Sequence, residues 1–222
     1  MADALSGLSL SRGKTLAEQT SELLREMIVS GEIPANSVLT EYELARQLSI
    51  SRSPLREALH RLQDEGLLES IGHRGVIVPP VTRSFVRNLY DVREALEVKA
   101  AELASPPPEA DLQRARETLL AARSLLDTGD ASAFTAADFD FHNLYIARCE
   151  NPLLQKQVSR IRSSIRRVHI FANPLTDHIY QSADEHTAIL EALESGAMEE
   201  VPSLVSRHIR GVSGRLAGYV ES

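Results

Sequence analysis

The fold of the first third of the chain is decided by residues 40–75, TEYELARQLSISRSPLREALHRLQDEGLLESIGHRG. Thr40 and Glu43 have the spacing of a capping box, which marks the start of a helix. A second helix follows, capped by either Ser51 or Ser53 and ended by Gly66. After it, residues 67–80 form a pattern typical of two short strands around a tight turn at 72–75. Two short helices, a turn and a hairpin predict a winged helix-turn-helix.

Helical patterns surround this segment. Residues 1–13 are small and polar and predict a flexible N-terminus, and residues 15–31 predict one helix. A linker at 79–80 is followed by six predicted helices, at about residues 84–104, 109–127, 131–149, 152–173, 176–194 and from the turn at 195–196 to 219. The expected fold class is mainly α, with a winged helix-turn-helix over residues 14–80 and an antiparallel all-helical bundle over residues 81–222.

Composition limits the class of protein. The chain has 222 residues, 43% of them hydrophobic, and a formal net charge of -7. Its single cysteine, Cys149, excludes a disulfide within the chain and fits the reducing cytoplasm. The longest apolar runs fall short of the roughly 18 residues that a membrane helix needs. We therefore expect a cytoplasmic protein with no membrane partner.

A group of exposed cations and hydroxyls is expected at the start of the helix that follows residue 51. Leucines at positions 55, 59 and 62 would bury the opposite face of this helix. Arginine can bond guanine or phosphate, and serine hydroxyls and helix N-termini bond phosphate. The wing tip could reach an adjacent minor groove. The candidate DNA contacts are Ser51, Arg52, Ser53, Arg56, His73 and Arg74.

The total charge counts mildly against nucleic-acid binding, but local charge decides where a phosphate backbone docks. Between positions 46 and 61 there are four arginines and one acidic residue, Glu57. The alternative is a small helical subdomain with a solvated arginine face.

The same stretch resembles the N-terminal domain of GntR-type regulators. The matching motifs are Glu-Leu-Ala at 43–45, Ile-Ser-Arg at 50–52, Pro-Leu-Arg-Glu-Ala-Leu at 54–59, Gly-Leu at 66–67 and the glycine-rich wing at 72–75. The resemblance implies that Arg52 and Arg56 are the main contacts to double-stranded operator DNA, with Ser51, Ser53 and the wing assisting. Tyr42 departs from the family, whose members often carry a longer polar or basic residue there.

The second half of the chain contains a candidate metal site. Asp138 and His142 are four residues apart and share one helix face. His186 and His208 lie ten and twelve residues from Gly196, so on two antiparallel helices both would be roughly 15 Å from the turn. One carboxylate and three imidazoles suit zinc, nickel, manganese or iron and leave positions open for a ligand. The alternative is that these are ordinary surface or core histidines.

Residues 139–154, the DEHTAILEAL segment at 184–193 and His208 resemble the FadR-type branch of these regulators, which has the FCD effector domain. In metal-containing members the ligand pattern maps onto Asp138, His142, His186 and His208, and zinc is the expected metal. The resemblance also assigns Arg93 to the effector cavity and implies a small carboxylic acid as effector. Arg162 and Arg166, four residues apart, could point inward as well, or form a solvated face with Arg160 and Arg167. His169 and His178 fit no ligand position.

These expectations lead to one main hypothesis: a homodimeric repressor that a carboxylic acid releases from a near-palindromic operator. Two alternatives remain. The helical domain could be a metal-dependent enzyme, although no spare buried acid or base beside the metal is evident in the sequence. The metal could also be purely structural.

Overall fold

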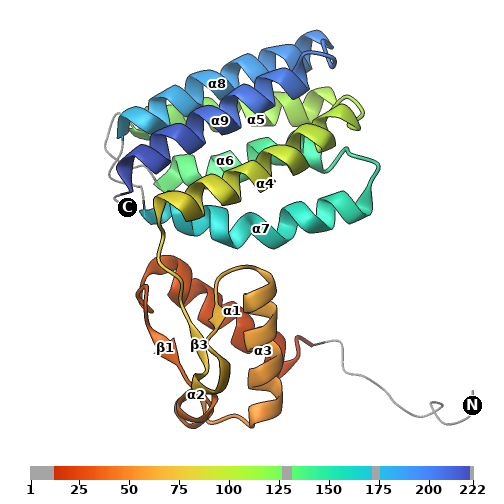
Figure 1. The fold of residues 1–222 in the computed structure, drawn as a ribbon. Coiled ribbons are helices and arrows are strands. Elements are labelled where there is room, and N and C mark those ends of the chain that lie inside the picture. Colours follow the sequence, from red (N-terminus) through yellow and green to blue (C-terminus); the bar gives the residue numbers. More distant parts are fainter. Residues whose placement is uncertain (1–12, 127–131, 172–175, 221–222) are drawn as a thin grey trace, which may run out of the picture.

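The computed structural model describes residues 13–126, 132–171 and 176–220, without the side chains of residues 125–136 and 172–178. Nearly all of the predicted flexible N-terminus and the side chain of His178 therefore lie outside the described residues. The described chain forms a small mixed unit below a helical bundle (Figure 1). The prediction of a mainly helical fold with an N-terminal winged helix-turn-helix is confirmed.

The first unit contains three helices and a small sheet. Its elements are α1 (Leu16–Ser30), β1 (Val38–Leu39), α2 (Glu41–Leu48), α3 (Arg52–Asp64), β2 (Glu69–Ser70), the 3-10 turn η1 (Gly72–Arg74) and β3 (Val76–Ile77). The strands are antiparallel in the order β1-β3-β2. The sequence pattern missed β1, because a two-residue strand carries no alternation of its own. It is held by the register Val38 to Ile77.

Capping residues set the starts of these helices. Thr15 and Glu18 make the predicted reciprocal capping box on α1. On α2, Thr40 accepts from the Glu43 amide, but its hydroxyl also bonds the Glu43 carboxylate, so only half of a capping box forms. Ser51 is the N-cap of α3 by position and makes no capping hydrogen bond with its side chain. The three helices and the sheet close over a leucine-rich core that includes Leu24, Ile28, Leu55, Leu62 and Leu67.

The second unit is the predicted six-helix bundle. Its helices are α4 (Arg83–Glu102), α5 (Glu109–Leu126), α6 (Ser132–Ile146), α7 (Pro152–Phe171), α8 (Thr176–Ser195) and α9 (Val201–Tyr219). Helix α4 packs along α9, while α7 contacts both α4 and α1 of the first unit. A second apolar core runs through the bundle. Among the described residues, no helix is apolar over the length that a bilayer crossing requires.

The interior of the bundle is unusually polar for a helical core. Charged and ionisable side chains are almost completely buried there, namely Arg93, Glu97, Asp138, His142, His186 and His208. Burying charge is costly unless each group finds a partner. This cluster is therefore the place to look for a function in the second unit.

Candidate metal centre and nucleic-acid interface

The four predicted metal ligands converge in the centre of the bundle. Asp138 and His142 come from α6, His186 from α8 and His208 from α9, and one donor atom of each lies within 4.8 Å of the others. The Nε2 atom of His186 is 3.2 Å from the Nε2 atoms of both His142 and His208. The Asp138 Oδ1 atom is 3.4 Å from the same nitrogen. Three helices thus place four donor atoms around one point.

The hydrogen bonds behind two of the imidazoles fix which nitrogen faces that point. His142 donates from Nδ1 to Glu97 Oε2 at 2.6 Å, and His208 donates from Nδ1 to Glu185 Oε2 at 2.7 Å. In its neutral form, each ring therefore presents the lone pair of its Nε2 atom to the cluster. A carboxylate behind a histidine is the usual outer partner of a metal-binding imidazole.

The charges of the cluster also fit a cation. Burial lowers the pKa of His186 and of His208 well below the usual histidine range, and the neighbouring histidines add to this effect. Both rings are therefore neutral, as metal ligation requires. Burial opposes the charged forms of both Asp138 and His142, but Glu97 raises the pKa of His142, and the charged His142 ring holds the pKa of the facing Asp138 carboxyl well below normal. The buried Asp138 Oδ2 atom accepts no hydrogen bond from the described residues. The donor set fits a divalent transition metal.

Sequence reasoning missed the second layer of this site. Glu97 accepts from Arg93 Nε at 2.7 Å and from the Tyr145 hydroxyl at 2.7 Å, as well as from His142. Glu185 is held by Arg215 at 2.8 Å. The sequence revealed no spare buried acid or base beside the predicted ligands, and the structure shows two carboxylates there that are both engaged by neighbouring side chains. Glu97 follows Arg93 by four residues on α4 and Glu185 directly precedes His186, and these spacings were the available signals.

A cavity of about 160 Å³ opens beside the cluster between α4, α6 and α7. Arg93, Glu97, His142 and Arg162 contribute to its lining. Arg93 is 1% exposed, and its Nη2 atom lies 3.0 Å from His142 Nε2. Its Nη1 atom is buried and has no hydrogen-bond partner among the described residues. Arg93 therefore offers an unused donor at the junction of the cavity and the ligand cluster.

The other two arginines predicted to bind the effector, Arg162 and Arg166, contact different parts of the structure. The Arg162 guanidinium lies 4.8 Å from the centre of the Phe139 ring at the edge of this cavity. Arg166 instead pairs with Glu26 of α1 at 2.8 Å and does not line the cavity. Arg166 lies about 6 Å farther along α7 than Arg162, where α7 packs against α1 of the first unit. Arg166 is thus corrected from an effector contact to an interdomain contact.

Two further residues of α7, Arg167 and His169, bear on whether this helix presents a solvated arginine face and an additional ligand. Arg167 is buried and donates to the Pro79 carbonyl at 2.6 Å, so it does not belong to a solvated arginine face. His169 bonds the Tyr90 hydroxyl at 2.8 Å, and burial lowers its pKa to about 4. It stands outside the ligand set, as the sequence indicated.

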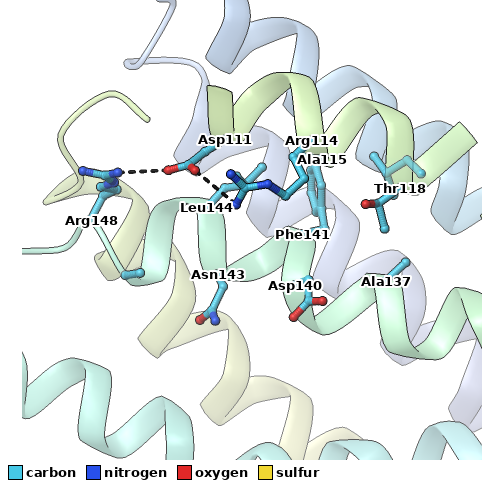
Figure 2. Close-up of a pocket in the computed structure, with 12 residues that line it drawn as sticks. Asp111, Arg114, Ala115, Thr118, Ala137, Asp140, Phe141, Asn143, Leu144 and Arg148 are labelled. Atoms are coloured by element: carbon cyan, nitrogen blue, oxygen red, sulfur yellow. Dashed lines mark hydrogen bonds and ion pairs between the residues drawn. The ribbon is translucent and has the colours of Figure 1, made fainter. Parts of the chain in front are cut away.

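A larger cavity, of about 500 Å³, lies between α5 and α6 (Figure 2). At its rim, Asp111 pairs with Arg148 at 3.0 Å and with Arg114 at 3.5 Å. Its Phe141 wall stacks on His186 with ring centres 4.4 Å apart, but none of the four metal ligands lines it. Size therefore does not identify the functional cavity. The unused donor of Arg93 and the adjacent His142 favour the smaller one.

The predicted DNA-contact residues lie at the start of α3 and in the wing. Arg52, Ser53, His73 and Arg74 are exposed, as is Ser51 at the N-cap. The Arg52 guanidinium stands 5.9 Å from the ring centre of Tyr42, which is 63% exposed. This surface offers a cation, hydroxyls and an aromatic ring together, which suits a phosphate backbone and base edges.

Arg56 is not a free cation in this structure. Its Nε and Nη2 atoms donate to the Glu41 carboxylate at 2.9 and 2.7 Å. Arg61 likewise pairs with Glu57 and Glu18. Glu57 is the only acidic residue between positions 46 and 61, but α1 and α2 bring Glu18 and Glu41 from outside that range to the same surface.

Comparison with known proteins identifies a family for each of the two units of the chain. The family model described as "Bacterial regulatory proteins, gntR family" matches residues 16–78, and the model of the FCD domain matches residues 88–211, more than half of the chain. The chain belongs to the GntR family of transcriptional regulators. It carries the FCD effector domain, so it is a DNA-binding regulator that responds to a ligand.

Named relatives of this GntR regulator include operon repressors. It is 31% identical to the "Nta operon transcriptional regulator" of Aminobacter aminovorans, over 83% of this chain and 86% of that protein. It is 29% identical to the "Probable D-xylose utilization operon transcriptional repressor" of Paenarthrobacter nicotinovorans, over 88% and 86%. The solved structure of E. coli McbR/YncC shares the fold, with a TM-score of 0.73, 20% identity and coverage of 92% of this chain and 98% of that one.

Proposed function

We propose that this GntR regulator is a metal-containing repressor that a small carboxylic acid releases from its operator. The observation that carries the proposal is the convergence of Asp138, His142, His186 and His208 beside Arg93. A bound divalent metal would supply Lewis acidity and open coordination positions for an oxygen ligand. Zinc is the metal we assign, because three imidazoles and one carboxylate suit it well; nickel, manganese and iron take the same donors.

Charge balance supports an anionic effector. A divalent ion and Arg93 together bring three positive charges to the site, whereas Asp138 and Glu97 bring two negative ones. An unneutralised charge in a buried site is costly, so a carboxylate completes the balance. Arg93 is suited to bind it, because Glu97 holds its Nε atom and its Nη1 donor points to no protein partner among the described residues. Arg162 at the cavity edge would extend this contact.

On the DNA side, Arg52 and Arg56 of α3 would enter the major groove, with Ser51, Ser53 and the wing residues His73 and Arg74 on the backbone and minor groove. Two subunits would pair so that two copies of α3 reach successive major grooves of a near-palindromic operator. We assign DNA binding to residues 14–80 and effector binding and dimerisation to residues 81–222. A cytoplasmic location fits the one buried, unbridged cysteine.

We infer no enzymatic role for the bundle. Glu97 and Tyr145 are the acid and base candidates near the ligand cluster, and both are engaged with each other and with His142. Their contacts support a role in orienting His142 and Arg93.

Elemental analysis of purified protein tests the metal assignment. We expect about one metal per chain in the wild type and none in an Asp138→Ala/His186→Ala double variant, with a matched His73→Ala/Asp64→Ala variant retaining it. A well-folded wild type that takes up neither zinc, nickel nor manganese would refute the site. Mobility-shift assays with the loaded protein then test the repressor assignment. A carboxylic acid that tightened operator binding would overturn it.

A further inference from the structure

Helix α7 touches both the effector cavity and the DNA-binding unit. Val158, Ser159, Arg162 and Ile165 contribute to the lining of the 160 Å³ cavity. Ser164, next to Ile165 in the chain, faces the other way. Its hydroxyl donates to the backbone carbonyl of Glu65 at 2.8 Å. A single helix thus connects the two functional sites of one chain.

Ser164 contacts the C-terminal end of α3, the recognition helix, which carries the predicted DNA contacts at its other end. Glu65 is the C-cap of α3, and the last carbonyls of a helix have no partner within the helix. Ser164 therefore supplies the partner that α3 lacks at this end. The Glu65 side chain is fixed as well, by two hydrogen bonds from Arg25 at 2.6 and 2.7 Å. Gly66 follows with a φ of 71°, and a Cβ atom there would stand 3.4 Å from the Ser164 hydroxyl.

A second contact of α7 holds the linker. Arg167 is 6% exposed and donates to the carbonyl of Pro79, three residues before Thr82, the N-cap of α4. Helix α4 in turn contributes Arg93 and Glu97 to the cavity. A displacement of α7 would therefore reach the DNA-binding unit both through α3 and through the linker.

The distances that a displacement would cover along α7 and α3 are short, and both helices are rigid. Ser159 and Ser164 are separated by about 7.5 Å along α7. From Glu65 back to Arg52, α3 extends for about 20 Å. Its buried leucines Leu55, Leu59 and Leu62 keep it packed as one body. A shift imposed at the Glu65 end is consequently delivered to the end that carries the DNA contacts.

We propose that α7 transmits effector occupancy to the recognition helix within the same chain, through Ser164 on Glu65 and Arg167 on Pro79. This inference rests on the proposed function for the identity of the signal. The physical connection itself requires neither the metal nor the natural effector. It differs from a purely intersubunit mechanism, in which the helical domains reorient and the DNA-binding units follow passively.

A tethered carboxylate tests the connection without knowledge of the effector. Ser159→Cys, alkylated with iodoacetate, places a carboxymethyl group at the cavity wall, and iodoacetamide provides a neutral group of the same size. Cys149 is buried and the unsubstituted chain, treated in the same way, controls for its reaction. Hydrogen exchange at residues 65–68 and 81–82 and the operator dissociation constant are measured in the full-length protein.

We expect the tethered carboxylate to change exchange in both segments and operator affinity by about fivefold or more, the usual lower range of allosteric coupling. Adding Ser164→Ala should reduce the change in exchange at residues 65–68 and the change in operator affinity to less than about twofold, whereas residues 81–82, which Arg167 reaches through Pro79, should still respond. Adding Ser163→Ala, the same change one residue away on α7, should leave them intact. Thermal melts of the unalkylated variants verify that all are folded.

Equal responses in the Ser164→Ala and Ser163→Ala backgrounds would overturn the inference. So would an unchanged exchange rate at residues 65–68 after alkylation. Failure of the proposed function has a different signature, namely absence of bound metal in elemental analysis, and does not affect this experiment.

Discussion

The Arg93 guanidinium and the Glu97 carboxylate form a 2.7 Å hydrogen-bonded ion pair inside the helical bundle, where their side chains are only 1% and 2% exposed. Glu97 is also the acceptor for His142 and Tyr145. This one carboxylate therefore connects the proposed effector-binding arginine with one of the proposed metal ligands. Burial opposes its ionisation, but Arg93 and His142 hold its pKa below the usual range.

Removing one charge of this pair should lower the free energy of unfolding more than removing both charges. Arg93→Met leaves Glu97 buried without its main counter-charge and should lower the free energy of unfolding by about 3 kcal/mol. Arg93→Met/Glu97→Gln should recover part of that loss. Urea unfolding of the zinc-free proteins measures both values. A double variant that is less stable than the single one would contradict the role given to the pair.

Glu185→Gln should weaken metal binding without unfolding the protein. Glu185 is partly exposed and accepts from His208 Nδ1, which keeps the lone pair of Nε2 directed at the ligand cluster. Loss of such an outer carboxylate lowers metal affinity by about 10- to 100-fold. Competition with a chromophoric zinc chelator measures the affinity. Glu191→Gln, an exposed position on the same helix, should bind zinc like the wild type, and equal affinities in both variants would argue against the orienting role.

Glu41→Gln should tighten binding to DNA. Glu41 occupies the Arg56 guanidinium with two hydrogen bonds and adds a negative charge to the surface that approaches phosphates. An exposed ion pair contributes little free energy, so the affinity for DNA should rise by about two- to fivefold at moderate salt. Fluorescence anisotropy with an operator duplex measures it, and Glu32→Gln is the control. Weaker binding in Glu41→Gln would mean that Glu41 positions Arg56 for DNA.

Arg52→Ala should weaken operator binding and leave the metal site intact. A bidentate contact of arginine with a base contributes about tenfold or more to discrimination. The variant should therefore bind the operator at least about tenfold more weakly and retain the metal content of the wild type. Arg160→Ala, at an exposed position on α7, should not change DNA binding. Comparable losses in the two variants would point to a non-specific charge effect.

Metal removal should destabilise the bundle reversibly. A metal that binds only the folded state raises the free energy of unfolding by about 3 kcal/mol when its free concentration is 100 times the dissociation constant. Chelation should lower the melting temperature, and zinc should restore it in the wild type but not in Asp138→Ala/His186→Ala. If chelation destabilises the protein but never alters carboxylic-acid affinity, the metal is structural and not sensory.

Local patterns in the sequence were sufficient for the helices and for pairing the candidate ligands two by two, whereas the resemblance to the FadR-type branch joined the two pairs into one site. Capping residues, prolines and helical periodicity are short-range signals, and they located the six bundle helices within a few residues. Asp138 and His142 lie on one face because they are four residues apart, and the hairpin at Gly196 brings His186 and His208 to the same level. These relations depend on helical geometry alone.

Only the tertiary structure decided which partner each side chain meets. The four-residue spacing placed Arg162 and Arg166 on one face of a helix, but the packing of α7 against α1 brings Arg166 to Glu26. In the same way, α1 and α2 bring Glu18 and Glu41 to arginines that are far from them in sequence. The spacing of Glu97 from Arg93 is a sequence signal for their pairing, but only the packing of α4 against α6 shows that Glu97 also bonds His142. Such contacts depend on the rotation and position of whole helices, which the distributed packing of the core sets and no single residue encodes.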